Sequence, residues 1–151
     1  MKVVVQRVTE ASVEVDNNIT GKINKGLLIL VGFTYNDNIS IIEKMVDKVL
    51  NLRIFDDENN IPNKSVLDIE GSILSVSQFT LYASTNKGRR PSYNLALNGE
   101  EASKLYDIWN ELLSKKINVQ TGIFGASMQV KLNNDGPMTI IIESDEWYDK
   151  K

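Results

Sequence analysis

Apolar positions in the first third of the chain follow the two-residue period of β-strands. Valine dominates residues 3–8, and residues 11–15 place Val13 and Val15 on one face with Ser12 and Glu14 on the other. Residues 16–18 have the composition of a turn, and residues 19–23 that of a weak strand. Residues 26–33 form an apolar run typical of a strand buried on both faces. The pattern predicts that the chain begins with successive strands.

Helical spacing appears twice further along the chain. An apolar stripe over residues 41–50 predicts a helix, for which we expect Ser40 as N-cap and Glu43 as its partner in a capping box. A second helix is predicted to start near Asn98, with Glu101 as capping partner. Its apolar stripe consists of Ala102, Leu105, Tyr106, Trp109, Leu112 and Leu113. Aromatic residues at this spacing indicate a packed core rather than a cofactor site.

The remaining segments predict further strands and loops. Residues 52–55 and 73–81 are expected to be extended, with polar loops at 56–65 and 86–93. Residues 128–133 and 138–143 are expected to be two strands joined by a turn at 134–137, and the tail from 144 either frays or docks on the body. Roughly seven or eight strands with two irregularly placed helices predict one α/β domain over residues 1–151, a mixed sandwich or barrel rather than a doubly wound sheet.

Composition agrees with an ordinary globular domain. The chain has 151 residues, of which 42% are hydrophobic and 25% charged. The longest apolar run is far too short to span a bilayer, so we expect no membrane partner. Gln6 and Arg7 interrupt any signal-peptide core, and the expected location is the cytoplasm.

The residue types that are missing restrict the possible chemistry. The chain has no cysteine and no histidine, which removes disulfides, thiol nucleophiles, the usual zinc ligands and the commonest general base near neutral pH. Any catalysis must use hydroxyls, carboxylates, amides, lysine, backbone dipoles or groups of the substrate. The acidic run at 56–58 lacks a recognisable ligand spacing and favours a solvated turn over a metal site.

One predicted strand carries an unusual number of hydrogen-bonding side chains. Alternation places Gln78 and Thr80 on one face and Ser77 and Phe79 on the other. If the strand ends near Phe79, its last N–H groups are free to form an oxyanion hole. The residues alone favour the alternative, a core strand whose polar groups bond internally.

Two further segments have two interpretations each. Gly136 and Pro137 follow an aspartate, which fits a hairpin turn; yet Pro137 also lacks a backbone donor and leaves carbonyls free to point outward. The basic loop contains Lys87, Arg89 and Arg90 in a chain of net charge −3. This local patch is compatible with nucleic-acid contact, but the pattern alone favours a solvated loop.

Several motifs together resemble those of the D-aminoacyl-tRNA deacylase family. They occur in one order along the chain: VVQRV at 4–8, ASV at 11–13, LRIF at 52–55, SQFTLYA at 77–83, KGRRPS at 87–92, FGA and MQV at 124–130, and NDGP at 134–137. The resemblance extends from residue 1 to about residue 144. Departures from the family pattern lie in loops, on surfaces and in the tail, outside these motifs.

The resemblance implies a fold and an activity. The expected fold is a three-layer β/β/α sandwich with barrel-like mixed sheets and two amphipathic helices. The expected reaction is hydrolysis of D-aminoacyl-tRNA, and of mischarged glycyl-tRNA, as proofreading in translation. The expected assembly is a homodimer with active sites at the subunit interface, acting without metal or cofactor.

The same resemblance assigns roles to residues. Gln78, Phe79 and Thr80 are the expected catalytic residues, with the N–H groups of Phe79 and Thr80 holding the oxyanion. The glycine–proline bond is expected to be cis and to reach into the partner's pocket, where its carbonyls exclude an L side chain. The expected substrate-binding residues are Ser77, Ala102, Phe124, Met128, Gly136 and Pro137. The expected tRNA-binding residues are Lys87, Arg89 and Arg90.

Two other functions remain open on the sequence. One is a dimer that binds nucleic acid without catalysis and uses the pocket for terminal adenosine. The other is a related deacylase with a trans glycine–proline bond and a preference for L-amino acids. The role of Thr80 is also open, between nucleophile, water-positioning group and pocket wall; the absence of histidine favours assistance by the substrate's 2′-hydroxyl.

Overall fold

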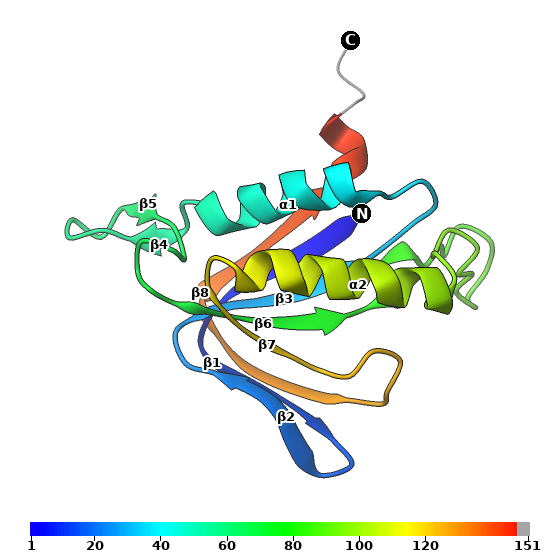
Figure 1. Cartoon of the computed structure of the whole chain (residues 1–151), viewed down its shortest axis with the longest axis horizontal. Coiled ribbons are helices and arrows are strands. Elements are labelled where there is room, and N and C mark those ends of the chain that lie inside the picture. Colours follow the sequence, from blue (N-terminus) through cyan, green and yellow to red (C-terminus); the bar gives the residue numbers. More distant parts are fainter. Residues whose placement is uncertain (148–151) are drawn as a thin grey trace.

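One mixed β-sheet with two helices on one of its faces forms the body of the protein (Figure 1). The computed structural model describes residues 1–147. The sheet consists of β1 (Lys2–Val15), β2 (Asn18–Ile23), β3 (Gly26–Gly32), β6 (Ser72–Ser77), β7 (Asn118–Thr121) and β8 (Gln129–Glu143). The other elements are the helices α1 (Ile39–Asn51) and α2 (Gly99–Ser114), the small hairpin of β4 (Phe55–Asp56) and β5 (Pro62–Lys64), and the 3₁₀ turns η1 (Phe79–Tyr82) and η2 (Ser144–Trp147).

The long strand β1 organises the sheet. Its first half, up to Val8, pairs antiparallel with β3, and its second half, from Ala11, pairs with β2. β8 runs antiparallel along the other edge of both halves. The strands expected at 3–8 and 11–15 are therefore one strand, and the exposed residues Thr9 and Glu10 lie at the irregularity between its halves.

The sheet curls until it is nearly closed. β3, β6 and β7 are parallel neighbours and lead the sheet back toward β2. The hydroxyl of Thr20 in β2 donates to the carbonyl of Thr121 in β7 at 3.3 Å. Gly21 approaches β7 so closely that a Cβ there would lie 2.8 Å from the same carbonyl, which explains the glycine. The expected α/β class, with a barrel-like mixed sheet and two amphipathic helices, is confirmed.

Curling of the sheet creates two apolar cores. The larger core lies between the sheet and the helices, and its two largest fully buried side chains are those of Trp109 and Phe55. The smaller core fills the curled half and contains Val8, Ala11, Val13, Ile23, Leu28, Leu74 and Val76. Each large side chain buried in this way contributes about 1.5–3 kcal/mol, so the two cores hold the helices and the curled strands in fixed positions.

One of the two predicted helix starts is correct. Asn98 caps α2, and its side chain accepts from the N–H of Glu101 at 3.0 Å. The prediction of Ser40 as the cap of α1 is wrong, because Asn38 accepts from the N–H of Ile41 at 3.0 Å and Ser40 is already inside the helix. Asparagine caps as well as serine, so the earlier residue takes the position. Within residues 1–147, neither helix is long and apolar enough to cross a membrane.

The segment after α1 is more ordered than its composition predicts. Only Phe55 of the segment expected to be extended at 52–55 lies in a strand, and part of the predicted loop at 56–65 forms β5. The carboxylate of Asp57 accepts from the N–H groups of Asn59 at 2.8 Å and Ile61 at 3.2 Å. These two bonds lower the pKa of Asp57. The acidic turn is therefore organised by its own backbone.

The described end of the chain docks on the body. Ser144 is buried, and Trp147 packs against the larger core beneath Lys44, whose Nζ lies 4.7 Å from the ring centroid. The rest of the tail, from residue 148, lies outside the described residues.

Candidate active site

The strand β6 ends earlier than predicted, and this ending shapes the site. Its ladder with β3 stops at Ser77, where the N–H of Gln78 makes a last bond to the carbonyl of Val31 at 2.8 Å. The chain then turns into η1, so the prediction of a strand through residue 81 is wrong. β3 itself ends at Gly32, and the chain beyond Gln78 has no parallel neighbour with which to continue the ladder.

The turn η1 orients two backbone donors. Phe79 and Thr80 are its first residues, and the first N–H groups of a helical turn have no acceptor within the turn. Both residues are exposed, whereas Ser77 and Gln78 are half-buried. The side-chain amide of Gln78 donates to the hydroxyl of Thr80. The predicted alternation of faces is thus replaced by a turn in which amide, hydroxyl and N–H groups lie together.

A cavity of about 500 Å³ opens beside this turn. It lies at the carboxyl ends of the parallel strands β3 and β6, under the start of α2, which is where open α/β sheets bind ligands. The residues predicted for the site that line the cavity are Ser77, Gln78, Phe79, Ala102, Phe124 and Met128. Thr80 is not among the lining residues of the described chain, although it bonds to Gln78, which is.

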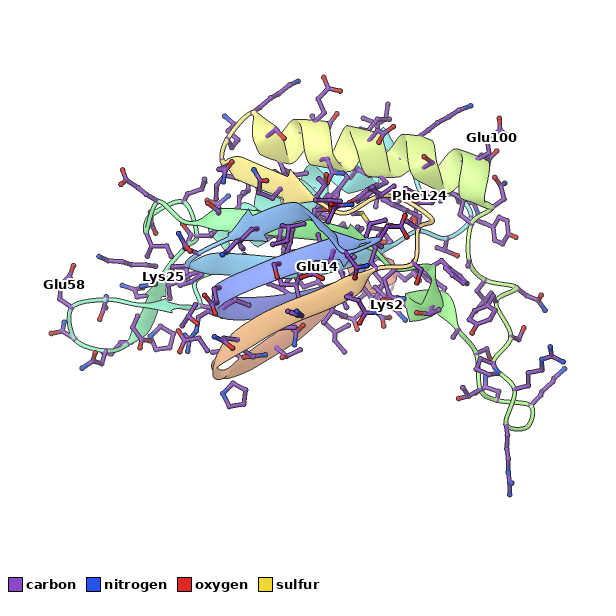
Figure 2. The ribbon with its side chains drawn as sticks, turned by 90° about the horizontal axis from the view of Figure 1, so that it is seen from below. Lys2, Glu14, Lys25, Glu58, Glu100 and Phe124 are labelled. Atoms are coloured by element: carbon purple, nitrogen blue, oxygen red, sulfur yellow. The ribbon has the colours of Figure 1, made fainter. Side chains whose placement is uncertain are left out.

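The roof of the cavity is fixed by a serine that the sequence analysis did not single out. Ser75, buried in the middle of β6, accepts from the hydroxyl of Tyr106 through its carbonyl at 2.7 Å and from the indole of Trp109 through its hydroxyl at 3.2 Å. Burial raises the pKa of Tyr106. The ring of Tyr106 lies 5.8 Å from that of Phe124, which Figure 2 places beneath α2. A serine within an aliphatic strand, together with aromatic residues that need a partner, is a signal that sequence reasoning could have used.

The segment around Gly136 and Pro137 does not form a hairpin. Gln129–Glu143 is one strand that runs antiparallel to β1 throughout, and residues 135–138 bulge out of it opposite Arg7. The prediction of two strands joined by a turn is therefore wrong. The side chain of Asn134 closes the bulge by accepting from the N–H of Met138 at 2.7 Å. The Gly136–Pro137 peptide bond is cis.

Arg7 fixes this bulge from β1. Its Nε donates to the carbonyl of Asp135 at 3.0 Å, and its Nη1 donates to the carbonyl of Ile54 at 2.6 Å. Gly136 has a φ of 133°, a conformation that strains any other residue, and a Cβ there would lie 3.0 Å from Arg7 Nη2. Sequence reasoning quoted Arg7 within a motif but missed this role; the signal was a charged residue among the valines of a strand.

Within one chain, the predicted substrate-site residues therefore lie in two separate places, around the cavity and on the bulge of β8. Gly136 and Pro137 are exposed, and among the described residues they do not line the cavity. β8, which carries them, pairs along one edge with β1, and no strand within residues 1–147 pairs with its other edge.

The predicted tRNA-binding residues lie on a projecting loop. Ser84 and Ser92 close the loop by exchanging two backbone hydrogen bonds of 2.8 Å, and Gly88 at its tip has a φ of 89°. All three cations, Lys87, Arg89 and Arg90, are exposed. The loop leaves the body next to the beginning of α2 (Figure 2).

No metal-binding group is apparent in the described chain. Within residues 1–147, no three acidic side chains come together closely enough to hold a metal ion, and the chain has no histidine or cysteine. Among the described residues, the polar side chains that line the cavity are those of Ser77 and Gln78.

Comparisons with known proteins agree with one another. A sequence model described as D-Tyr-tRNA(Tyr) deacylase matches residues 4–143. The chain is 54% identical to the D-aminoacyl-tRNA deacylase of Bacillus velezensis, covering 95% of this chain and 99% of that protein. It is 52% identical to the D-aminoacyl-tRNA deacylase of Bacillus pumilus, covering 97% of this chain and all of that protein.

Two solved structures are similar in fold. One, described as a c-Myc DNA unwinding element binding protein, has a TM-score of 0.90 and 44% identity, with 95% of this chain and 98% of that chain covered. The other, described as a probable eukaryotic D-amino acid tRNA deacylase, has a TM-score of 0.81 over 93% of this chain and 97% of that chain. At 18% identity, this second likeness concerns the fold alone.

Proposed function

We propose a reaction mechanism for this chain, which belongs to the D-Tyr-tRNA(Tyr) deacylase family. The protein is a D-aminoacyl-tRNA deacylase, a hydrolase that acts on tRNA carrying a D-amino acid. The observation that carries the mechanism is the cavity at the ends of β3 and β6, with Phe79, the first residue of η1, among its lining residues.

The cavity is the proposed site of the aminoacylated terminal adenosine. Its volume of about 500 Å³ is within the usual range of ligand sites. Ala102, Phe124 and Met128 supply apolar walls for the adenine and the aminoacyl group, and Ser77 and Gln78 supply polar groups near the ester. Fixing the ester beside the backbone donors accounts for much of the rate enhancement expected from such a site.

Hydrolysis proceeds by attack of water on the ester carbonyl. The N–H groups of Phe79 and Thr80 hold the developing oxyanion; the carbon–oxygen bond to the ribose then breaks, and the ribose oxygen leaves with a proton. Without histidine, the proposed assisting group is the 2′-hydroxyl of the substrate. Thr80→Ala should therefore retain substantial activity, whereas a 2′-deoxy substrate should react poorly. Near-total loss in a folded Thr80→Ala protein that still binds tRNA would contradict this assignment.

The proposed chiral filter is formed by a second copy of the chain. Gly136 and Pro137 are exposed, lie apart from the cavity of their own chain and are held by Arg7. In a homodimer their carbonyls reach the partner's cavity and face the substrate's α-amino group, where an L side chain clashes with the backbone. Glycine has no side chain, so glycyl-tRNA passes the same filter.

Positive charge on the loop at 84–92 is the proposed contact to tRNA. Lys87, Arg89 and Arg90 are exposed together on an otherwise acidic chain, and phosphate contacts of this kind weaken as salt rises. Arg89→Glu should lower tRNA affinity and reduce its salt dependence; unchanged values for both would count against the contact.

A second candidate function is binding of nucleic acid without catalysis. The structural neighbour described as a DNA unwinding element binding protein favours its consideration, as does the basic loop. Turnover separates the two candidates. Purified protein is mixed with matched D-tyrosyl-tRNA and L-tyrosyl-tRNA, with and without a chelator. Rapid loss of the D-ester alone, unaffected by chelator, supports the enzyme and its filter. Loss of neither ester supports the binding module, and loss of the L-ester contradicts the filter.

A further inference from the structure

We propose that Phe79 and Tyr93 form a stacking platform for the unpaired nucleotides that precede the terminal adenosine of tRNA. The proposal rests on the function proposed above and adds a subsite to it. The cavity holds the terminal nucleoside, the aromatic platform holds the base next to it, and the loop at 84–92 holds the intervening phosphates.

The two rings form a single surface at the mouth of the cavity. Their centroids lie 5.0 Å apart with an interplanar angle of 64°, an edge-to-face pair. Phe79 is 56% exposed and Tyr93 is 42% exposed, although the two belong to different segments, η1 and the residues after the basic loop. Phe79 also lines the cavity, so the platform begins where the cavity ends.

The surroundings of the platform attract a polyanion. No acidic residue occurs between Glu70 and Glu100, in a chain whose net charge is −3. Within this segment, the closed loop at 84–92 presents Lys87, Arg89 and Arg90 directly before the platform residue Tyr93. Figure 2 shows the loop extending beyond the body on the side where Glu100 lies in the first turn of α2. Positive charge is therefore concentrated beside the aromatic pair and nowhere else in residues 71–99.

Aromatic rings beside a basic strip are the combination by which proteins hold single-stranded nucleic acid. Stacking on such rings tolerates any base, because every base has a π-face, and the cations follow the backbone. When the acceptor end of a tRNA places its last nucleoside in the cavity, the preceding nucleotides must cross the rim of the cavity. Phe79 is the rim residue that is joined to the basic loop through Tyr93, so the strand passes over this pair.

The first test compares two esters that differ only in length. D-tyrosyl-adenosine reaches the cavity alone, whereas the D-tyrosyl ester of the trinucleotide CCA also reaches the platform. Tyr93→Leu should lower kcat/KM for the trinucleotide ester roughly tenfold and for the adenosine ester less than about twofold, as expected for one lost stacking contact. Tyr93→Phe keeps the ring and should restore the trinucleotide ester. Phe79 is not substituted, since its N–H belongs to the proposed oxyanion site.

A matched control removes another exposed apolar side chain. Ile61 is 57% exposed in the turn between β4 and β5, at the end of the molecule opposite to the loop (Figure 1). Ile61→Ala should change neither ester. Equal losses for both esters in Tyr93→Leu, or no loss for either, would overturn the platform.

The second test needs no turnover and separates the platform from the proposed reaction. A short single-stranded RNA with 2-aminopurine in place of the base before the terminal adenosine is titrated with protein. Stacking should quench its fluorescence on titration with the wild type and with Tyr93→Phe. With Tyr93→Leu the protein concentration needed for half-maximal quenching should be at least about tenfold higher. Quenching of this RNA by a protein that hydrolyses neither ester of the first test would remove the proposed reaction and keep the platform. Hydrolysis with identical quenching by all three proteins would remove the platform and keep the reaction.

Discussion

Replacing Arg7 with leucine tests whether the bulge of β8 is held from β1. The side chain is only 12% exposed, and it donates to the carbonyls of Asp135 and Ile54 at 3.0 and 2.6 Å. Leucine fills part of the space but donates nothing, so both carbonyls lose a charged donor. Each such bond is worth about 1.5–3 kcal/mol when broken on one side. The ion pair with the carboxylate of Asp135, at 3.6 Å and 44% exposed, adds little.

The two bonds together are worth about 3–6 kcal/mol, and burial of part of the leucine side chain offsets about 1–2 kcal/mol, so the expected loss in the free energy of unfolding is about 2–4 kcal/mol. Urea denaturation measures it, and a slope near 2 kcal/mol per molar converts it to a midpoint lower by roughly 1–2 M. Both proteins are compared at one concentration, because the midpoint of the proposed dimer would depend on concentration. Arg53→Leu is the matched control: Arg53 is exposed and bonds to Asn63 in the same part of the chain, so its loss should stay within about 0.5 kcal/mol.

Activity gives the second readout. In buffer without urea, where Arg7→Leu is still folded, the ratio of D-tyrosyl-tRNA to L-tyrosyl-tRNA hydrolysis should fall, since the carbonyls of Gly136 and Pro137 are no longer aimed by a fixed contact. A misplacement of about 1 Å is enough for losses of up to roughly 10²-fold. An unchanged urea midpoint together with an unchanged D/L ratio would refute the reasoning that Arg7 positions the bulge.

The other predictions concern the cavity and its roof. In Ala102→Leu the larger side chain extends into the cavity, so kcat/KM for D-tyrosyl-tRNA should fall at least about tenfold. The free energy of unfolding should change by no more than about 1.5 kcal/mol. Full activity would mean that the substrate binds elsewhere. Tyr106→Phe removes the donor to the carbonyl of Ser75 and should cost about 1–3 kcal/mol in urea denaturation. Burial raises the pKa of Tyr82 and of Tyr106, so the folded chain keeps these protons longer than the unfolded chain. The free energy of unfolding should therefore fall as pH rises above about 10. In Tyr106→Phe this fall should be less steep, by about 1.4 kcal/mol per pH unit. Equal slopes in the two proteins would contradict the burial argument.

Elements that depend on local signals were predictable. Asn98 with Glu101 marked the start of α2, and the stripe from Ala102 to Leu113 marked its buried face. The cap of α1 was misplaced by two residues because Asn38 and Ser40 satisfy the same local rule. The start of a helix depends on which side chain accepts from its first free N–H groups, and the sequence alone allows either Asn38 or Ser40 to do so.

Features that depend on distant contacts were not predictable from local patterns. The sequence NDGP has the composition of a hairpin turn, yet the bulge it forms is held by Arg7, which lies 128 positions away from Asp135. Likewise, β6 ends at Ser77 because its neighbour β3 ends at Gly32, whereas the residues after Ser77 alternate as a strand would. The family resemblance nevertheless identified six residues that the structure brings to one cavity: Ser77, Gln78, Phe79, Ala102, Phe124 and Met128.

Both backbone features proposed to act on the substrate arise where a regular ladder is interrupted. β6 gives way to η1 after Ser77, so the N–H groups of Phe79 and Thr80 leave the strand ladder, and β8 bulges at residues 135–138, which exposes Gly136 and Pro137. A chain without histidine or cysteine has no side chain whose ordinary pKa lies near neutral pH, and the proposed mechanism relies on fixed backbone geometry instead. Backbone groups meet this need because they carry no charge that titrates. Such groups act only where they are held, so in the proposed mechanism the residues that hold them, Val31 beside η1 and Arg7 at the bulge, matter as much as those that touch the substrate.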